Sequence, residues 1–336
     1  MTPPRATSIR DVAERAGVSV GTVSNVLNGS TGVSPATVER VRAAIDELGY
    51  VRNEAARQLR AGRSSTVGLV VLDVRNPFFT DVARGAEDEA AAHGLSVILG
   101  NSDESAARES SYLDLFEEQR VHGVLISPYG DIESRLVALR GRGTPVVLVD
   151  RESRDAALSS VSVDDVAGGR LAVEHLLATG RRRIAFAGGP FDIRQVSDRL
   201  EGARAAVAGV PGAGLEVLEA QALTVLEGRR LGEQLVARAD RPDAVFAAND
   251  LVAVGLLQAL VMSGALRVPE DVALIGFDDI DFATATVVPL SSIRQPRHEI
   301  GATALRILRE EAADPALPPR RIVFQPELVV RASTAR

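Results

Sequence analysis

The chain has 336 residues, a formal net charge of −7 at neutral pH and no cysteine, so disulfides and thiolate chemistry are excluded. Its first residues lack the apolar run of a signal peptide, and no stretch approaches the ~18 apolar residues that a membrane-spanning helix needs. We therefore expect a cytoplasmic protein of two or three domains that does not bind a membrane.

Two short helices joined by a tight turn are predicted near the N-terminus. Ser8 can cap the first helix, apolar residues then recur every three or four positions, and a glycine ends it. Ser19 can cap a second helix, whose outward face is formed by Val20, Gly21 and Asn25. Ordinary helical bundles also contain such pairs, but small or neutral outward residues are unusual for a helix face that meets only solvent. The pattern therefore favours a helix-turn-helix whose second helix enters the DNA major groove.

The outward residues of the second helix suit different contacts with DNA. Asn25 can form a bidentate hydrogen bond with adenine, and Val20 can offer an apolar contact to a thymine methyl group. Gly21 lowers helix propensity, which a close approach of backbone to DNA would explain, although a glycine here can also simply be tolerated. Thr22 and Ser24 suit phosphate contacts or helix capping better than base reading.

A third helix and a short basic run follow. Ser34 is the expected cap of this helix and Pro35 its first residue, and its apolar stripe closes a minimal core. Residues 53–60 are again competent to form a helix, with one large apolar residue, Leu59, between basic ones. The first 63 residues contain nine arginines against six acidic residues, whereas the rest contains 29 arginines against 39 acidic residues. A basic module on an acidic body favours DNA binding by that module, doubled by dimerisation.

From residue 66 onward, apolar runs alternate with helix-length segments, which is typical of parallel sheets covered by helices. The first set of runs lies at 67–72, 95–99, 123–126 and 146–149, and the second set at 161–163, 184–187, 217–219, 244–247 and 272–275. Two consecutive α/β units of similar size predict two lobes that face each other across a cleft. Binding residues would then lie on loops at the carboxyl ends of the strands.

Aromatic and polar residues gather at these predicted strand ends. Aromatic faces flanked by fixed donors and acceptors are what a sugar ring needs. Each residue also has a simpler explanation as a helix start, core residue, ion pair or solvated acidic loop, but their convergence favours a binding site. The candidates are Asn76, Phe78, Phe79, Asp150, Arg151, Arg199, Asn249, Asp278 and Gln295.

The segments IRDVAERAGVS, TVSNVLN and AARQLR, in this order, resemble the lactose-repressor (LacI/GalR) family of bacterial transcription regulators. The resemblance implies a DNA-binding headpiece at residues 1–63, with a hinge helix at about 55–62. Leu59 would be a wedge in the DNA minor groove, and its basic neighbours argue against the alternative of a buried hinge residue. The DNA-binding residues implied are Ser19, Val20, Gly21, Thr22, Ser24, Asn25, Asn28, Tyr50, Ala56, Arg57, Leu59 and Arg60.

The resemblance also implies an effector-binding and dimerisation domain at residues 64–336, similar to periplasmic sugar-binding proteins. Its N-lobe would comprise about 64–162 plus 293–322, and its C-lobe about 163–292 plus 323–336. Phe78 and Phe79 would sandwich a sugar ring while the polar candidates bind its hydroxyl groups. Ile193 and Gln195 replace residues that read a purine in a purine-responsive relative, and Leu223 replaces an aromatic residue of some relatives. These differences favour a pentose or hexose over a purine.

The implied function is repression of a carbohydrate-utilisation operon by a homodimer that leaves its pseudo-palindromic operator when a monosaccharide or sugar derivative binds. An enzyme is not expected, because the four histidines are scattered and no nucleophile elbow, P-loop or dinucleotide-binding motif occurs. We therefore expect no catalytic residue, cofactor or metal. A sugar sensor or binding protein without DNA binding is the remaining alternative, and residues 1–63 decide between the two.

Overall fold

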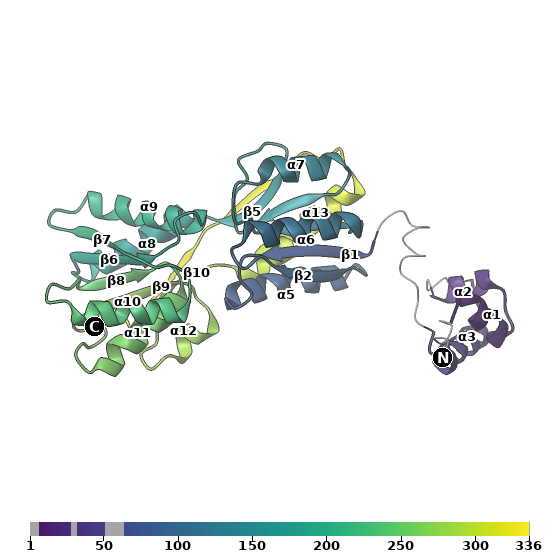
Figure 1. Cartoon of the computed structure of the whole chain (residues 1–336), viewed down its shortest axis with the longest axis horizontal. Coiled ribbons are helices and arrows are strands. Elements are labelled where there is room, and N and C mark those ends of the chain that lie inside the picture. Colours follow the sequence, from purple (N-terminus) through teal and green to yellow (C-terminus); the bar gives the residue numbers. More distant parts are fainter. Residues whose placement is uncertain (1–6, 28–31, 51–63, 336) are drawn as a thin grey trace. The chain divides into compact units, whose positions relative to one another are not determined.

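The computed structural model describes residues 7–27, 32–50 and 64–335, and the chain divides into two compact units, Met1–Ser64 and Ser65–Arg336. Figure 1 shows the helices of the first unit and the two sheet-containing lobes of the second. No helix in the described part of the chain is both long and apolar enough to cross a bilayer.

The first unit is built from three helices, α1 (Ile9–Ala16), α2 (Val20–Leu27) and α3 (Pro35–Leu48). Ser8 starts α1 with a capping box: its hydroxyl accepts from the N–H of Asp11, whose carboxylate accepts from the N–H of Ser8 at 2.7 Å. Gly17 ends α1 in the left-handed conformation, with φ of 66°. The side chains buried between the helices are Val12, Ala13, Ala16, Val23, Val41 and Ala44.

The predicted helix starts are confirmed, with one difference in capping. Ser19 caps α2, because its hydroxyl accepts from the N–H of Thr22 at 3.1 Å. Ser34 precedes α3 but makes no such bond to the helix backbone. Its hydroxyl lies 2.9 Å from that of Thr37 instead, so Pro35 remains the stronger start signal.

The second unit contains two six-stranded sheets, one in each lobe. The N-lobe sheet is parallel throughout, in the order β11-β5-β4-β3-β1-β2. Next to the β2 edge, Val70 of β1 is in register with Gly100 of β2 on one side and with Ile126 of β3 on the other. Its strands are β1 (Thr66–Val71), β2 (Ser96–Asn101), β3 (Gly123–Ile126), β4 (Val146–Val149), β5 (Ser159–Val163) and β11 (Arg321–Phe324).

The C-lobe sheet has the order β12-β10-β9-β8-β6-β7, in which only β12 runs antiparallel to its neighbour. Its strands are β6 (Arg183–Gly188), β7 (Gly214–Glu219), β8 (Ala244–Ala247), β9 (Ala273–Asp278), β10 (Ser291–Arg294) and β12 (Glu327–Val329). The predicted fold class, an N-terminal helical headpiece followed in the sequence by two parallel-sheet α/β lobes, is confirmed. One detail was wrong: the run at 161–163 belongs to the first sheet, because β5 pairs with β4 and β11.

Helices cover both faces of each sheet. In the N-lobe α5 (Pro77–Ala91) and α13 (Arg297–Ala313) pack on one face, and α6 (Ala106–Glu118) and α7 (Glu133–Gly141) on the other. In the C-lobe the corresponding pairs are α8 (Asp165–Ala178) with α9 (Arg194–Ala208), and α10 (Val225–Ala237) with α11 (Asp250–Ser263); α12 (Asp281–Ala285) is a short addition.

The packing of α5 against α13 requires glycine. A Cβ atom on Gly85 would lie 2.0 Å from the carbonyl oxygen of His298, and one on Gly301 would lie 1.9 Å from that of Val82. Both contacts are with backbone, so the two helices approach more closely than any larger residue permits.

The chain passes between the lobes three times, near 163–165, 294–297 and 324–327. Each lobe is therefore assembled from separated parts of the sequence. Since strands of both sheets end at the side where the lobes meet, the loops that follow β1, β4, β8 and β9 line one interlobe cleft.

Candidate nucleic-acid interface and ligand-binding cleft

In the first unit, α2 presents its predicted DNA-reading side only in part to solvent. Ser19, Gly21 and Asn25 are exposed, and Thr22 and Ser24 are half-buried. Val20 was expected to point outward, but it is half-buried and packs against the headpiece core. Its apolar side chain therefore divides its surface between the core and the outer face.

Of the remaining predicted DNA contacts, the structure describes only Tyr50. Tyr50 is half-buried against the headpiece core, and its N–H donates to the carbonyl oxygen of Ile45 at 3.0 Å. The other predicted contacts, Asn28, Ala56, Arg57, Leu59 and Arg60, lie outside the described residues, as does the predicted hinge helix.

In the second unit, Asp278 is the centre of a buried hydrogen-bond network between the lobes. It ends β9 with φ of 107°, and its Oδ2 accepts from Nδ2 of Asn76, at the start of α5 in the other lobe, at 3.1 Å. Its Oδ1 accepts from Nε2 of Gln295 at 2.8 Å and lies 3.9 Å from Nη1 of Arg199. Burial raises the pKa of Asp278, while Arg199 and the two amide bonds act against this rise.

Arg199 is fixed by three contacts within the C-lobe. Its Nε donates to Oδ1 of Asp165 at 2.8 Å, and its Nη1 donates to the carbonyl oxygen of Ala248 at 2.7 Å. Its guanidinium carbon lies 3.7 Å from the centre of the Phe277 ring. These contacts fix the position of the guanidinium group of Arg199 beside Asp278.

Asn76 and Asn249 hold the starts of two helices beside the cleft. The side-chain oxygen of Asn76 accepts from the N–H of Phe78 at 3.0 Å, and that of Asn249 accepts from the N–H of Val252 at 2.9 Å. These hydrogen bonds fix the orientation of both side-chain amide groups, and therefore also the direction of their N–H donors.

A cavity between the lobes brings most of the predicted ligand residues together. Arg151 and Gln295 do not line it: Arg151 donates from Nη1 to the carbonyl oxygen of Gly130 at 2.6 Å, and Gln295 lies behind Asp278. The lining residues are Leu72, Asp73, Asn76, Phe78, Phe79, Glu104, Asp150, Ile193, Gln195, Val196, Arg199, Leu223, Asn249 and Asp278.

The expected sandwich of a ring between Phe78 and Phe79 is wrong. The two rings contact each other edge to face, with their centres 5.0 Å apart, so no sugar ring fits between them. Both side chains are buried and form one wall of the cavity. As neighbours on α5 they point in different directions around the helix, so they cannot enclose a ligand from two sides.

Several lining residues were not among the predicted site residues. Asp73 and Glu104 follow β1 and β2, so the strand-end pattern could have found them. Burial raises the pKa of Glu104, and the carboxylate of Asp73 adds to the rise. Gln195, noted earlier only as a difference from a purine site, bridges the lobes: its Nε2 donates to the carbonyl oxygen and to Oδ2 of Asp150, at 2.7 and 2.9 Å.

A further bridge lies at the edge of the cleft. Tyr129, after β3, donates its hydroxyl to Oδ2 of Asp192, after β6, at 2.6 Å. This hydrogen bond, with smaller contributions from burial and the charge of Asp192, raises the pKa of Tyr129 to about 12. The lobes are thus joined by the pairs Asn76–Asp278, Gln195–Asp150 and Tyr129–Asp192.

The two units match two family descriptions. Residues 8–53 match the bacterial regulatory proteins of the lacI family, and residues 173–334 match the periplasmic binding protein-like domain. The ribose operon repressor of Escherichia coli (strain K12) is 35% identical over 331 residues, which cover 97% of this chain and 99% of the repressor. This chain belongs to the lacI family of transcriptional regulators.

Other relatives cover the chain as fully. The transcriptional repressor PurR of Photobacterium profundum is 33% identical over 335 residues, 97% of this chain and 98% of PurR. A solved structure of the lac repressor dimer bound to operator and the anti-inducer ONPF has a TM-score of 0.85 at 27% identity, covering 99% of this chain and 100% of that one. A LacI family regulator from Enterococcus faecium with bound ribose has a TM-score of 0.73 at 30% identity, covering 80% and 98%.

The predicted family is therefore confirmed, and with it a DNA-binding transcriptional regulator rather than an enzyme. The match over residues 8–53 favours this reading over a sugar sensor without DNA binding.

Proposed function

We propose that this lacI-family protein represses a sugar-utilisation operon and that ribose, or a closely related neutral pentose, binds in the interlobe cavity and releases it from its operator. The observation that carries the proposal is the buried Asp278 carboxylate, held by Asn76 and Gln295 beside Arg199. Fixed acceptors and donors of this kind suit the adjacent hydroxyl groups of a sugar. The ribose operon repressor and the ribose-bound Enterococcus faecium regulator support ribose as the first candidate.

The charges that line the cavity favour a neutral ligand. Asp73, Glu104, Asp150 and Asp278 line it, against one arginine, Arg199, which already binds Asp165. A phosphorylated sugar would bring further negative charge among these carboxyl groups. Inside the cleft, water screens the resulting repulsion poorly. Ile193 and Gln195 line the cavity and offer a purine few charged or polar partners. The polar candidates around Asp278 offer a pentose more of them.

We assign DNA contacts to the headpiece, with Asn25 as the base-reading residue and Ser19 and Thr22 as phosphate contacts at the start of α2. Asn25 is exposed, and the N-terminus of a helix attracts phosphate. Residues 55–62 remain the proposed hinge helix, with Leu59 as the minor-groove wedge. A protein that acts on chromosomal DNA is proposed to reside in the cytoplasm.

Two copies are proposed to pair through their effector domains and to present two headpieces to a pseudo-palindromic operator. Both lobes expose large apolar side chains that such a pairing would cover. They include Ile98, Leu99 and Leu115 in the N-lobe and Leu226, Phe282 and Val287 in the C-lobe.

Ribose binding and operator binding are proposed to oppose each other through lobe closure, with a coupling free energy of about 1 to 3 kcal/mol. The test is calorimetry of ribose binding to the full chain, free and bound to a duplex that the protein itself selects from random DNA. Linkage requires ribose to bind the DNA complex about 5- to 150-fold more weakly. Equal affinities in the two titrations would contradict the coupling, and no ribose binding to the free protein would contradict the ligand.

A further inference from the structure

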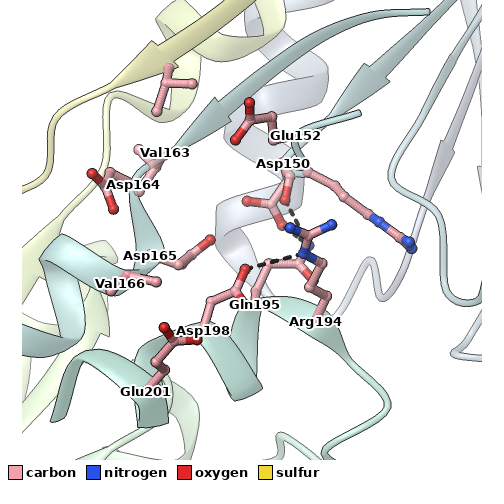
Figure 2. Close-up of a pocket in the computed structure, with 12 residues that line it drawn as sticks. Asp150, Glu152, Val163, Asp164, Asp165, Val166, Arg194, Gln195, Asp198 and Glu201 are labelled. Carbon is pink, nitrogen blue, oxygen red and sulfur yellow. Dashed lines mark hydrogen bonds and ion pairs between the residues drawn. The ribbon is translucent and has the colours of Figure 1, made fainter. Parts of the chain in front are cut away.

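A second pocket lies between the two lobes, beside two of the three chain crossovers, and we call it the hinge pocket. Its volume is about 280 Å³. Figure 2 shows the strand-to-helix passage of Val163 to Val166 on one side of it and Asp150, Arg194 and Gln195 on the other. Its lining residues are Asp150, Arg151, Glu152, Val163, Asp164, Asp165, Val166, Arg194, Gln195, Asp198, Glu201 and Val323.

The hinge pocket shares one wall with the interlobe cavity. Asp150 and Gln195 line both spaces, and they are hydrogen-bonded to each other across the lobes. Whatever binds on one side of this pair therefore meets the same two side chains as a ligand on the other side.

Asp150 has an unused polar atom at this wall. The residue is 3% exposed, and its Oδ2 accepts from Gln195, whereas its Oδ1 is buried and has no hydrogen-bond partner among the described residues. Buried polar atoms normally have partners, because leaving one unpaired is costly. A ligand on either side of this shared wall that reaches Oδ1 would supply the missing partner.

The hinge pocket carries an excess of negative charge. Asp165 is paired with Arg199, and Asp198 with Arg194. The other lining carboxyl groups have no ion pair within the described part of the chain, and a single arginine, Arg151, stands against them. They are Asp150, whose pKa burial and the nearby Asp165 raise well above its usual value, and Glu152, Asp164 and Glu201. An ammonium group, with three donors and a positive charge, satisfies such a set, whereas an anion would add to its repulsion.

Donors are left over as well. Nε of Arg151 and Nη1 of Arg194 are buried and have no acceptor within the described part of the chain. A hydroxyl group on the ligand can accept from such an N–H while the ammonium group meets the carboxylates.

We propose that the hinge pocket is a second ligand site, which takes a small hydroxylated amine: its ammonium group lies among Asp164, Glu201 and Asp150, and its hydroxyl group accepts from Arg194 or Arg151. The site stands on its own lining residues and does not depend on the identity of the ligand in the interlobe cavity.

The test uses the full chain without DNA, because amines also bind DNA. Calorimetry compares three four-carbon probes that share a hydroxyl group: 4-amino-1-butanol, 1,4-butanediol and 4-hydroxybutanoate. The amine is expected to bind, the diol to bind about tenfold more weakly and the anion not to bind; affinity for the amine falls as the salt concentration rises. Equal or tighter binding of the diol or the anion, or no binding of any probe at millimolar concentration, overturns the proposal.

A variant locates the binding. Asp164 caps α8 by accepting from the N–H of Ala167 at 2.8 Å, and asparagine caps as well as aspartate, so Asp164→Asn removes the charge and keeps the helix start. Combined with Glu201→Gln, it is expected to weaken 4-amino-1-butanol about tenfold without changing the melting temperature measurably. The matched control, Glu174→Gln on the same helix but outside the pocket, keeps wild-type affinity. Wild-type affinity in the double variant, or an equal loss in the control, overturns the assignment.

Discussion

Asp278 shows how one side chain can serve both lobes. Its two carboxylate oxygens accept from amide groups on opposite lobes, Asn76 and Gln295, and the same oxygens face the cavity that we assign to the sugar. A sugar hydroxyl that donates to Asp278 must therefore compete with, or complete, the contacts that hold the lobes together. In the proposed site, Asp278 thus links ligand binding to lobe position.

Binding of ribose should weaken as the pH falls. A hydroxyl donates best to the ionised carboxylate, and burial raises the pKa of Asp278, so protonation begins at a higher pH than for an ordinary aspartate. Affinity measured by calorimetry is expected to decline on acidification, with a midpoint above 3.8; Asp150 and Asp165, whose pKa values are also raised, titrate in the same network. Asp278→Asn should abolish detectable binding at every pH. If the Asp278→Asn variant binds ribose as tightly as the wild type, Asp278 is not part of the ribose site.

Replacing Asn25 tests base reading by α2. Asn25→Ala should cost about 1 to 3 kcal/mol of DNA affinity and relax the preference at one base pair, because a bidentate contact is lost. Gel shifts with the selected duplex and its single-base-pair variants measure both effects. The control is Asp46→Ala, on the exposed face of α3. An unchanged preference at every position would show that Asn25 does not read a base.

At the scale of elements, the loops after β3 and β6 meet at the edge of the cleft through Tyr129 and Asp192. Tyr129→Phe removes this one hydrogen bond and keeps the ring, so ribose affinity is expected to fall about two- to tenfold. Tyr112→Phe, on α6 and away from the interlobe cavity, is the matched control. If Tyr129→Phe binds ribose as tightly as the wild type, the pair does not contribute to closure.

The contact between α5 and α13 gives a test of packing. Gly85→Ala places a Cβ against the backbone of His298, and overpacking of this kind is expected to lower the free energy of unfolding by about 1 to 3 kcal/mol. In Gly141→Ala, at the end of α7, the new methyl group meets nothing within 4 Å, so stability should stay the same or rise slightly. Denaturation followed by circular dichroism measures both, and equal stability of the two variants would contradict the close-packing argument.

Elements with a strong local signal were predictable from the sequence. Buried strands such as β1, β3 and β4 are continuous apolar runs, and helix starts such as Ser8 and Ser19 carry a capping residue. The apolar run of strand β5 was grouped with the second set of strands, since the pattern SSVSV says nothing about which sheet it joins, although the expected N-lobe bounds, 64–162, include most of this strand. The short strands β10, β11 and β12 were missed because they mix polar and apolar residues.

The candidate site followed the same division. Strand-end logic brought Asn76, Asp150 and Asp278 to one cavity, because parallel strands end at one edge. It could not foresee the edge-to-face contact of Phe78 with Phe79, which depends on side-chain rotamers. Nor could it pair Gln195 with Asp150, whose contact depends on how two lobes meet.

For the whole molecule, the two units carry net charge of opposite sign. The first 63 residues carry nine arginines against six acidic residues, whereas the remainder is acidic. Duplex DNA repels the acidic effector domain, so binding rests on the headpiece and should weaken steeply with salt. The two ligands that we propose for this acidic body, a neutral sugar in the cleft and an amine in the hinge pocket, are consistent with its charge.

The three crossovers also bear on how the protein is made. The N-lobe sheet is completed only by β11, near residue 324, and its covering helix α13 is also late in the chain. On the ribosome the N-lobe therefore stays incomplete until almost the entire polypeptide has emerged, because α13 and β11 are the last of its elements to be synthesised. The headpiece, by contrast, uses only contiguous early residues, so nascent chains acquire a DNA-binding module long before they acquire the receptor that controls it.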